Sequence, residues 1–455
     1  MKKSTFLSGP ILPALLRFSV PILLALLLQA LYGAVDLWAV GRFCGEADVS
    51  AVATGSQAMQ IVTGLVTGLS TGTTVLLGKQ VGQRDHKGAA DLIGSSIWIF
   101  GALGVILSVV VPLCAPAIAE AMNAPGEAMG KTVAYIQICG AGSLFIVGYN
   151  LISAIFRGLG DSKSPLLFVL IACGANIAGD ILLIKYFRLA AAGAAIATIG
   201  AQGVSVLLSL VLIRRRGLPF PVGRRNLRFS RGAGRGVVRL GTPIALQSMC
   251  NEISYLILIG LVNALGVTAS AGVGIAEKLV MFILLIPMAF MQSISSIVAQ
   301  NIGAGQEERA KRVMWVGIGT AALLGGVMSY LSFFHGDTLS SIFIKEAAVI
   351  AASAEFLRAT AIECFILSIA YCFTGYFNGV GRTAFVMVQG LCAIFLVRIP
   401  YAWLASRRPE PRLFQIGLSA AWAAVFTLAV CAGCYLRHTR KKAGRPWEPE
   451  AKTAG

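Results

Sequence analysis

Two aspartates lie inside stretches of the sequence that are otherwise apolar. Asp36 lies near the end of the run PILLALLLQALYGAVDLWAVG, which begins at Pro21, and Asp180 ends the segment NIAGD. A charged carboxylate in the middle of a lipid-spanning helix costs at least about 2.5–3.5 kcal/mol. Such a residue therefore indicates a site that binds a cation or a proton. The alternatives are an aspartate paired with a basic residue for packing alone, or one that reaches water at a helix end.

Three further oxygen-bearing side chains are expected at the depth of these aspartates. Asn176 precedes Asp180 by one helical turn, so the two share a helix face. Thr198 and Tyr135 lie early in apolar runs that enter from the same side of the membrane. At about 1.5 Å per residue, these positions have similar depths. We therefore predict one cluster in the first half of the chain, made of Asp36, Tyr135, Asn176, Asp180 and Thr198.

The chemistry of such a cluster is cation exchange. Two neighbouring carboxylates at low dielectric cannot both stay ionised unless a cation lies between them. Such a pair could bind and release either H⁺ or Na⁺, and because the same oxygens serve both ions, the sequence does not separate the two. Pro21, on the helix of Asp36, interrupts the backbone hydrogen-bond ladder. It predicts a helix that bends when the carboxylates are neutralised, with a static kink as the alternative.

The elements that position these residues are membrane spans. The chain has 455 residues, of which 13% are charged, and its mean hydropathy is +0.78. Soluble domains carry about 25% charged residues, so this composition predicts an all-α polytopic membrane protein. Runs long enough to cross a bilayer predict 12 transmembrane helices at residues 11–37, 51–77, 90–112, 129–152, 166–184, 190–213, 241–264, 270–298, 313–336, 352–376, 384–405 and 413–436.

The two halves of the chain resemble each other at an offset of about 221–222 residues. SVPI and GTPI, GKQVG and AQNIG, and FRGLGDSKS and FNGVGRTAF are matching landmarks, which indicates duplication. Each half holds an even number of spans, so we predict two pseudo-symmetric six-helix bundles related by an axis along the membrane normal. The predicted parts are an N-lobe (1–213), a basic cytoplasmic linker (214–240), a C-lobe (241–436) and a cytoplasmic tail (437–455).

The net charge of +18 reflects orientation in the membrane. Lys and Arg gather in the loops and tails of one side, which places both termini in the cytoplasm of a plasma-membrane protein. No aromatic interleaving accompanies the arginine clusters, so nucleic-acid binding is not expected. The ten cysteines are scattered, and the lone CxxC at Cys431 has no second pair, so neither a structural metal nor a cofactor is expected.

The second half also carries ionisable residues near mid-depth: Glu252, Lys278, Glu363 and Arg398. Two acids and two bases could neutralise each other as structural ion pairs. They could instead form a cation-attracting wall of a substrate cavity or a second protonation site. The repeat and the span faces suggest that this cavity is lined by Gln29, Tyr32, Gln247, Asn251, Glu252, Met281 and Met288, although apolar stripes of this kind more often face lipid or core.

These residues together resemble the multidrug and toxic compound extrusion family of secondary transporters, over nearly the whole chain. The resemblance rests on SVPILLALLLQALYGAVDLWAVGRF, RGLGDSKSP, NIAGD, AAGAAIATIGAQ, AQNIGAG, RIP and QIGLSAA. It implies twelve helices in two V-shaped lobes and export of cationic, lipophilic compounds driven by a Na⁺ or H⁺ gradient. It also implies that Asp36, Asn176, Asp180 and Thr198 bind the coupling cation, with Pro21 and Tyr135 supporting them.

One departure from the family pattern concerns the second lobe. Members with a second-lobe Na⁺ site have an acid in span seven and an Asp in span ten. The matching span-seven position here is Asn251, with Glu252 beside it, and Glu363 lies about one turn from the expected span-ten position. The sequence therefore favours cation coupling in the first lobe.

Other functions fit the sequence less well. A lipid-linked oligosaccharide flippase of the same superfamily would favour a cationic cavity, whereas the first-lobe cavity is acidic. A membrane-embedded enzyme lacks support because neither HExxH nor GxSxG occurs and the three histidines lie near loops or ends. The duplicated bundles and the carboxylate pair argue against a channel. We expect a monomer whose ligands are small organic cations.

Overall fold

The computed structural model describes residues 6–220, 223, 226 and 228–442, and the secondary structure there is helical. The first group of helices holds both predicted aspartates, since α1 carries Asp36 and α6 ends at Asp180. Its members are α1 (Ile11–Phe43), α2 (Glu46–Gln83), α3 (His86–Ala121), α4 (Gly126–Ala141), α5 (Ser143–Leu159), α6 (Lys163–Asp180), the π-helical turn η1 (Ile181–Tyr186) and α7 (Ala190–Arg216).

The second group follows the same general order. It has one long helix, α12, where the first group has α4 and α5, and it adds the short helices α11 and α14. Its members are α8 (Arg231–Asn263), α9 (Val267–Gly303), α10 (Glu307–Phe334), α11 (Gly336–Ser341), α12 (Ala347–Val380), α13 (Thr383–Cys392), the π-helical turn η2 (Ala393–Arg398), α14 (Ile399–Ser406) and α15 (Leu413–Lys442). The two groups are called the N-lobe and the C-lobe below.

The prediction of twelve membrane spans is confirmed. Among the described residues, eleven helical stretches are long and apolar enough to cross a membrane, and α4 and α5 taken together, with a bend of 49°, give the twelfth. The bend falls at Gly142, where a side chain would overlap Ile199 of α7. A glycine is therefore required at this break, because α7 crosses the bent span there without room for a Cβ atom.

The helices extend beyond the predicted runs into the predicted linker. α7 continues to Arg216, and α8 begins at Arg231, almost three turns before the predicted start of the apolar run at residue 241. This first part of α8 carries the exposed residues Arg231, Arg235 and Arg239. The connection between the lobes is therefore confined to residues 217–230. Arginine is a good helix former. An arginine-rich segment at the membrane surface can therefore be helical, and its charge alone does not indicate a linker.

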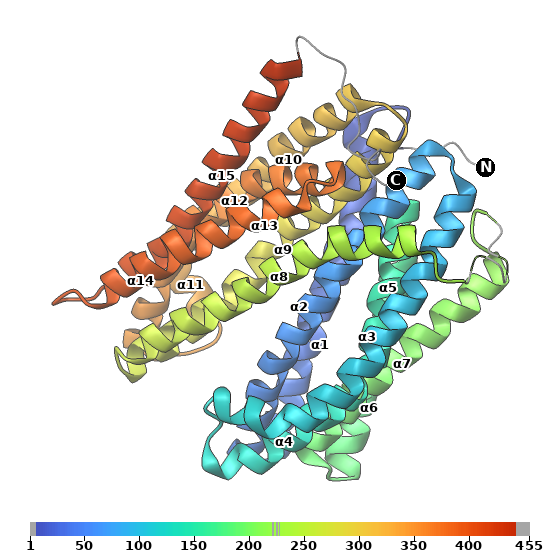
Figure 1. Ribbon diagram of the computed structural model, residues 1–455. Coiled ribbons are helices and arrows are strands. Elements are labelled where there is room, and N and C mark those ends of the chain that lie inside the picture. The colour runs from blue at the N-terminus through green and yellow to red at the C-terminus, as the bar shows by residue number, and fades with distance from the viewer. Residues whose placement is uncertain (1–5, 221–222, 224–225, 227, 443–455) are drawn as a thin grey trace.

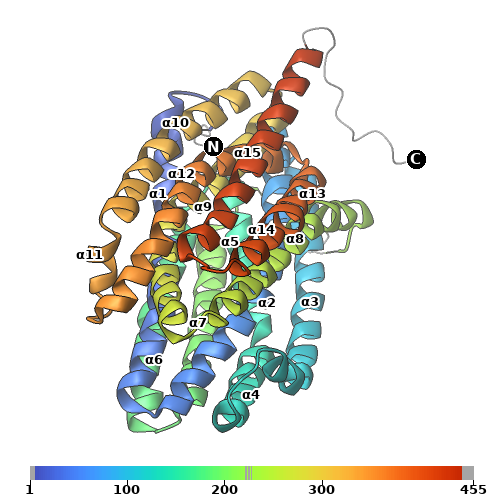
Figure 2. The ribbon, with the colours of Figure 1, turned by 90° about the vertical axis from the view of Figure 1, so that its left-hand side faces the viewer.

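The two lobes diverge from one end of the molecule (Figure 1). At that end Phe6 lies between them: its backbone carbonyl accepts hydrogen bonds from Asn301 (3.3 Å) and Arg309 (2.9 Å) of the C-lobe. Its ring lies against Gly160 of the N-lobe, where an added Cβ would be 3.0 Å from Cε2. The view turned by 90° shows α2 passing close to α8 and α9 (Figure 2).

Two glycines at equivalent positions of the repeat make the closest contact between the lobes. Gly82 ends α2 and Gly303 ends α9. A Cβ atom on Gly82 would overlap the carbonyl oxygen of Gln300, and one on Gly303 would overlap the carbonyl oxygen of Lys79. Each helix end thus packs on the backbone of the other, which only residues without a side chain permit.

The residues that these glycines contact also bind across the interface. Lys79 Nζ of α2 donates to the carbonyl of Val380 at the end of α12 (2.7 Å). Gln300 Nε2 of α9 donates to the carbonyl of Gly158 near the end of α5 (2.9 Å). In each case a side chain satisfies a carbonyl at a helix C-terminus, where no intrahelical donor is available. We call this pair of reciprocal contacts the crossed latch.

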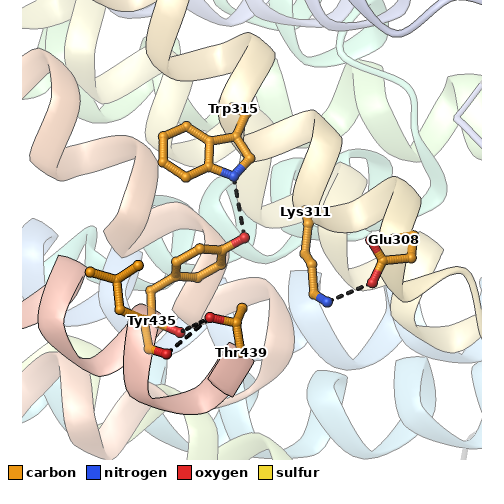
Figure 3. A network of polar contacts seen from close by, with 6 residues as sticks. Glu308, Lys311, Trp315, Tyr435 and Thr439 are labelled. Carbon is orange, nitrogen blue, oxygen red and sulfur yellow. Dashed lines mark hydrogen bonds and ion pairs between the residues drawn. The ribbon is translucent and has the colours of Figure 1, made fainter. Parts of the chain in front are cut away.

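Side chains of α10 and α15 meet in the C-lobe (Figure 3). Trp315 Nε1 donates to the hydroxyl of Tyr435 (3.2 Å), and the rings of these residues meet edge to face with centroids 5.8 Å apart. One turn before Trp315, Lys311 pairs with Glu308 (2.6 Å). Tyr435 also belongs to the large apolar core that joins α1, α9, α10 and α12.

Candidate functional site

Four of the five predicted cluster residues meet inside the N-lobe. Asp36 comes from α1, Asn176 and Asp180 from the end of α6, and Thr198 from the third turn of α7. Asp180 and Asn176 are 0% and 1% exposed and Asp36 is 5% exposed, so this is a buried polar site. The packing of α1 on α6 and of α6 on α7 brings the three helix faces together.

Hydrogen bonds connect these side chains. Thr198 Oγ1 donates to Asp36 Oδ2 (3.0 Å), and Asn176 Nδ2 donates to Thr198 Oγ1 (3.5 Å). The carboxyl groups of Asp36 and Asp180 lie within hydrogen-bonding reach of each other. The two acids therefore face one another, and a single proton could be shared between them.

Several oxygens of this site have no hydrogen-bond donor. Within the described residues, they are one oxygen each of Asp36 and Asn176 and both carboxylate oxygens of Asp180. Buried polar atoms are almost always satisfied, and an unsatisfied one calls for an explanation such as a bound ion. Carboxylate and amide oxygens are ligands that hard cations prefer. The residues present thus fit a small cation or a proton.

A π-helical turn begins directly after Asp180. In η1 the i→i−4 hydrogen-bond pattern of α6 is lost, and such turns occur frequently at functional sites. Asp180 is therefore held at the junction of two helical geometries, on a fully buried face. This turn was not predictable from the residues, because ILLIKY is compatible with an ordinary helix.

Tyr135 lies near the four residues without a hydrogen bond to them. It is 3% exposed on α4, next to Cys139 and within electrostatic range of Asp36. Its ring occupies the space beside Gly55 of α2, where a Cβ atom would overlap Cδ1. Tyr135 therefore contributes a wall of the site. Pro21 lies buried inside α1, about four turns before Asp36. Bending of α1 there remains a prediction.

The family relation is decided by a sequence comparison. The MatE family model matches residues 21–182 and again residues 243–404. The chain belongs to the MatE family of multidrug and toxic compound extrusion transporters. The double match also confirms the internal duplication, since the same model fits each lobe once.

Relatives and solved structures agree with membership of the MatE family. A probable multidrug resistance protein of Bacillus subtilis, YpnP, is 29% identical over 452 residues, which cover 97% of this chain and 98% of YpnP. The multidrug export protein MepA of Staphylococcus saprophyticus is 25% identical, covering 86% of this chain and 87% of MepA. A MATE transporter solved in an outward-facing conformation has the same fold, with a TM-score of 0.90 at 20% identity and coverage of 97% and 99%.

The C-lobe of this MatE protein holds a second polar cluster, which differs from the predicted one. Glu252 of α8, Glu277 of α9 and Glu363 of α12 all lie within electrostatic range of Arg398, the last residue of η2. Tyr255 hydrogen-bonds to Glu277. In the described chain Arg398 forms no ion pair, and its buried Nε has no hydrogen-bond partner.

The prediction that Lys278 belongs to this cluster is wrong. Lys278 is exposed on α9, and its neighbour Glu277 points to Arg398 instead. Adjacent residues of a helix point about 100° apart, so only one of the two can face the lobe interior. The balanced set of two acids and two bases is thus replaced by three acids around one base.

All of the predicted cavity residues are at least partly exposed, and three of them also have contacts within their own lobe. Gln29 donates to the Tyr149 hydroxyl (3.3 Å) and Tyr32 accepts from Gln202 (3.4 Å), both within the N-lobe. Gln247 packs within the C-lobe, where a Cβ atom on Gly390 would overlap its amide. The remaining predicted residues are at least partly exposed; they are Asn251, Glu252, Met281 and Met288.

Proposed function

We propose that this protein is a secondary antiporter that exports cationic, lipophilic drugs in exchange for H⁺ or Na⁺ by alternating access. The observation that carries the proposal is the buried pair Asp36 and Asp180, in which three of the four carboxylate oxygens have no donor among the described residues. Drug export is supported by the relatives, which are named as multidrug resistance and multidrug export proteins. Intramembrane acids of this kind are characteristic of ion pathways and proton relays.

In the proposed cycle, the coupling ion and the drug do not occupy the site together. With the site open outward, a proton or Na⁺ neutralises the carboxylate pair. Pro21 then allows α1 to bend, because the backbone carbonyl one turn before it has no amide donor. The bend changes the shape of the N-lobe interior next to Gln29 and Tyr32, and the drug is released. Ion release on the other side restores the charge that attracts the next cationic drug.

The proposed orientation follows from charge. The lobes are joined at the end that carries the connection 217–230 with its flanking arginines. By the positive-inside rule this end faces the cytoplasm, which places both termini in the cytoplasm of a plasma-membrane protein. The conformation is then closed inward and open outward.

The surplus acids around Arg398 would favour cationic over anionic drugs in the C-lobe. A monomer suffices for this cycle, since each lobe supplies one wall.

Uptake of a fluorescent organic cation into inverted vesicles tests the proposal. Imposing a proton gradient and a Na⁺ gradient in turn should drive uptake with at least one of them, and the effective gradient identifies the coupling ion. Ethidium is a suitable probe, and vesicles from cells that lack the protein serve as the control. Uptake that neither gradient drives and that requires ATP would contradict antiport.

We expect the Thr198 hydroxyl to contribute to this exchange through its hydrogen bond to Asp36. Thr198→Val removes the observed donor to Asp36 Oδ2 and should lower export about tenfold, because a hydrogen bond to a charged group contributes on the order of 1.5–3 kcal/mol. Thr198→Ser keeps the hydroxyl and should retain most of the activity. Vesicle uptake measures both, and equal activity of the Val and wild-type proteins would remove this hydrogen bond from the mechanism.

A further inference from the structure

A pocket of about 530 Å³ opens between the lobes, away from both polar clusters. One wall is α3 of the N-lobe and the other is the first part of α8 of the C-lobe, with the end of the connection between them. Its lining residues are Ile99, Phe229, Arg231, Gly234, Arg235, Val238 and Arg239. This lining combines an apolar wall with three cations and contains no acid.

The arginines of the pocket form one basic face. Arg231, Arg235 and Arg239 are spaced four residues apart, so they lie on the same side of α8, and all three are exposed. Among the residues that the structure describes, none of the three forms an ion pair. Their charge is therefore available to a ligand.

The apolar wall lies directly beside this face. Phe229 is 52% and Val238 44% exposed. The Phe229 ring lies on Gly234, where an added Cβ would be 2.7 Å from Cζ, and Ile99 closes the same spot from α3. Trp98, next to Ile99, is exposed as well, and Trp is enriched at the boundary between membrane and water. The exposed Trp98 therefore indicates that the pocket lies where lipid headgroups meet acyl chains.

The end of the connection is fixed on α3, so the pocket has a defined shape. Asn226 Nδ2 donates to Asp91 Oδ1 (2.8 Å), and the Ser230 amide donates to Ser95 Oγ (3.0 Å). These two bonds hold Phe229 between the lobes. The first of these bonds also engages the carboxylate of Asp91 on α3.

We propose that this pocket binds an anionic phospholipid, whose phosphate lies on Arg235 and Arg239 and whose acyl chain runs along Phe229 and Val238. A soluble anion would bind only to the arginines. A lipid can bind to the arginines through its headgroup and pack its acyl chain on the apolar residues of the lining. Basic pockets between membrane helices on the cytoplasmic side bind such headgroups. Because its walls come from both lobes, a lipid bound here favours the arrangement in which this end is closed.

The test uses the purified full-length protein in detergent with added phosphatidylglycerol. We expect this lipid to raise the thermal unfolding midpoint of the wild type more than phosphatidylcholine does. The Arg235→Gln/Arg239→Gln variant should bind it about tenfold or more weakly by lipid titration, since each surface arginine contributes to anionic-lipid binding. The matched control is Arg214→Gln/Arg215→Gln, which removes the same charge from exposed residues at the end of α7 and should bind like the wild type.

Three outcomes would overturn the proposal. Equal weakening in the pocket variant and the control would mean that general surface charge attracts the lipid. Stabilisation by inorganic phosphate equal to that by phosphatidylglycerol would mean a soluble-anion site. Full binding by the pocket variant would mean that the lipid binds elsewhere. None of these results depends on drug transport, so the antiport proposal is tested separately.

Discussion

Cells that express the Asp36→Asn protein should be as sensitive to drugs as cells that carry no transporter. The amide has nearly the shape of the carboxylate, and it can still accept the hydrogen bond from Thr198. It cannot carry a negative charge or take up a proton, so the pair with Asp180 can no longer exchange a cation. Growth inhibition by several cationic drugs, with immunoblotting for the amount of protein in the membrane, measures the effect.

A matched acid in the same lobe serves as the control. Asp48 of α2 is also buried, but Lys131 pairs with it at 2.7 Å, and the lysine is 47% exposed. This pair is an ordinary ion pair with a solvent-exposed partner, so Asp48→Asn should keep resistance. Wild-type resistance in the Asp36→Asn strain, or an equal loss in the Asp48→Asn strain, would show that Asp36 has no special role.

A single added methyl group at Gly303 should open the closed end of the molecule. The Cβ of Gly303→Ala would overlap the Lys79 carbonyl of the other lobe, so the ends of α2 and α9 must separate. Separation also breaks the crossed latch, whose two hydrogen bonds are 2.7 and 2.9 Å long. We expect a longer distance between the lobes at this end and a large loss of transport. Gly82→Ala, at the equivalent position of the repeat, should act in the same way.

Pulsed electron paramagnetic resonance measures this opening. Spin labels at the exposed residues Lys87 and Gln306, in a cysteine-free background, report the distance between the lobes at the closed end. Gly274→Ala on the same helix is the control, because nothing lies within 4 Å of its added Cβ and alanine favours helix over glycine. An unchanged distance distribution in Gly303→Ala would mean that the latch does not hold the lobes together.

The spans were predictable because lipid imposes a simple constraint. A backbone inside a bilayer must bond to itself, so an apolar run of sufficient length is a helix, and all twelve predicted runs are recovered. The bend at Gly142 was not predictable. It depends on Ile199 of α7 lying against that glycine, and glycine is also used for ordinary packing between membrane helices. The helical start of α8 was missed because its arginines and glycines resemble a linker.

The N-lobe cluster was predictable because its residues share both depth and helix face. Asn176 and Asp180 are one turn apart, and Thr198 enters the membrane from the same side as Tyr135. The C-lobe cluster was not predictable, because the depth of a residue in the membrane does not show which way its side chain points. Glu277 and Lys278 have the same depth, yet only Glu277 reaches Arg398. Likewise, Gln29 and Tyr32 have a suitable depth for a cavity, but they are hydrogen-bonded within their own lobe.

Cation release on drug binding tests the proposed exchange most directly. The purified protein is mixed with a cationic drug, and a weakly buffered pH indicator and a Na⁺ electrode record the ions that leave. We expect drug binding to displace H⁺ or Na⁺ from the wild type and neither ion from the Asp36→Asn/Asp180→Asn protein. Release from that double variant equal to the wild-type release would contradict exchange at this carboxylate pair.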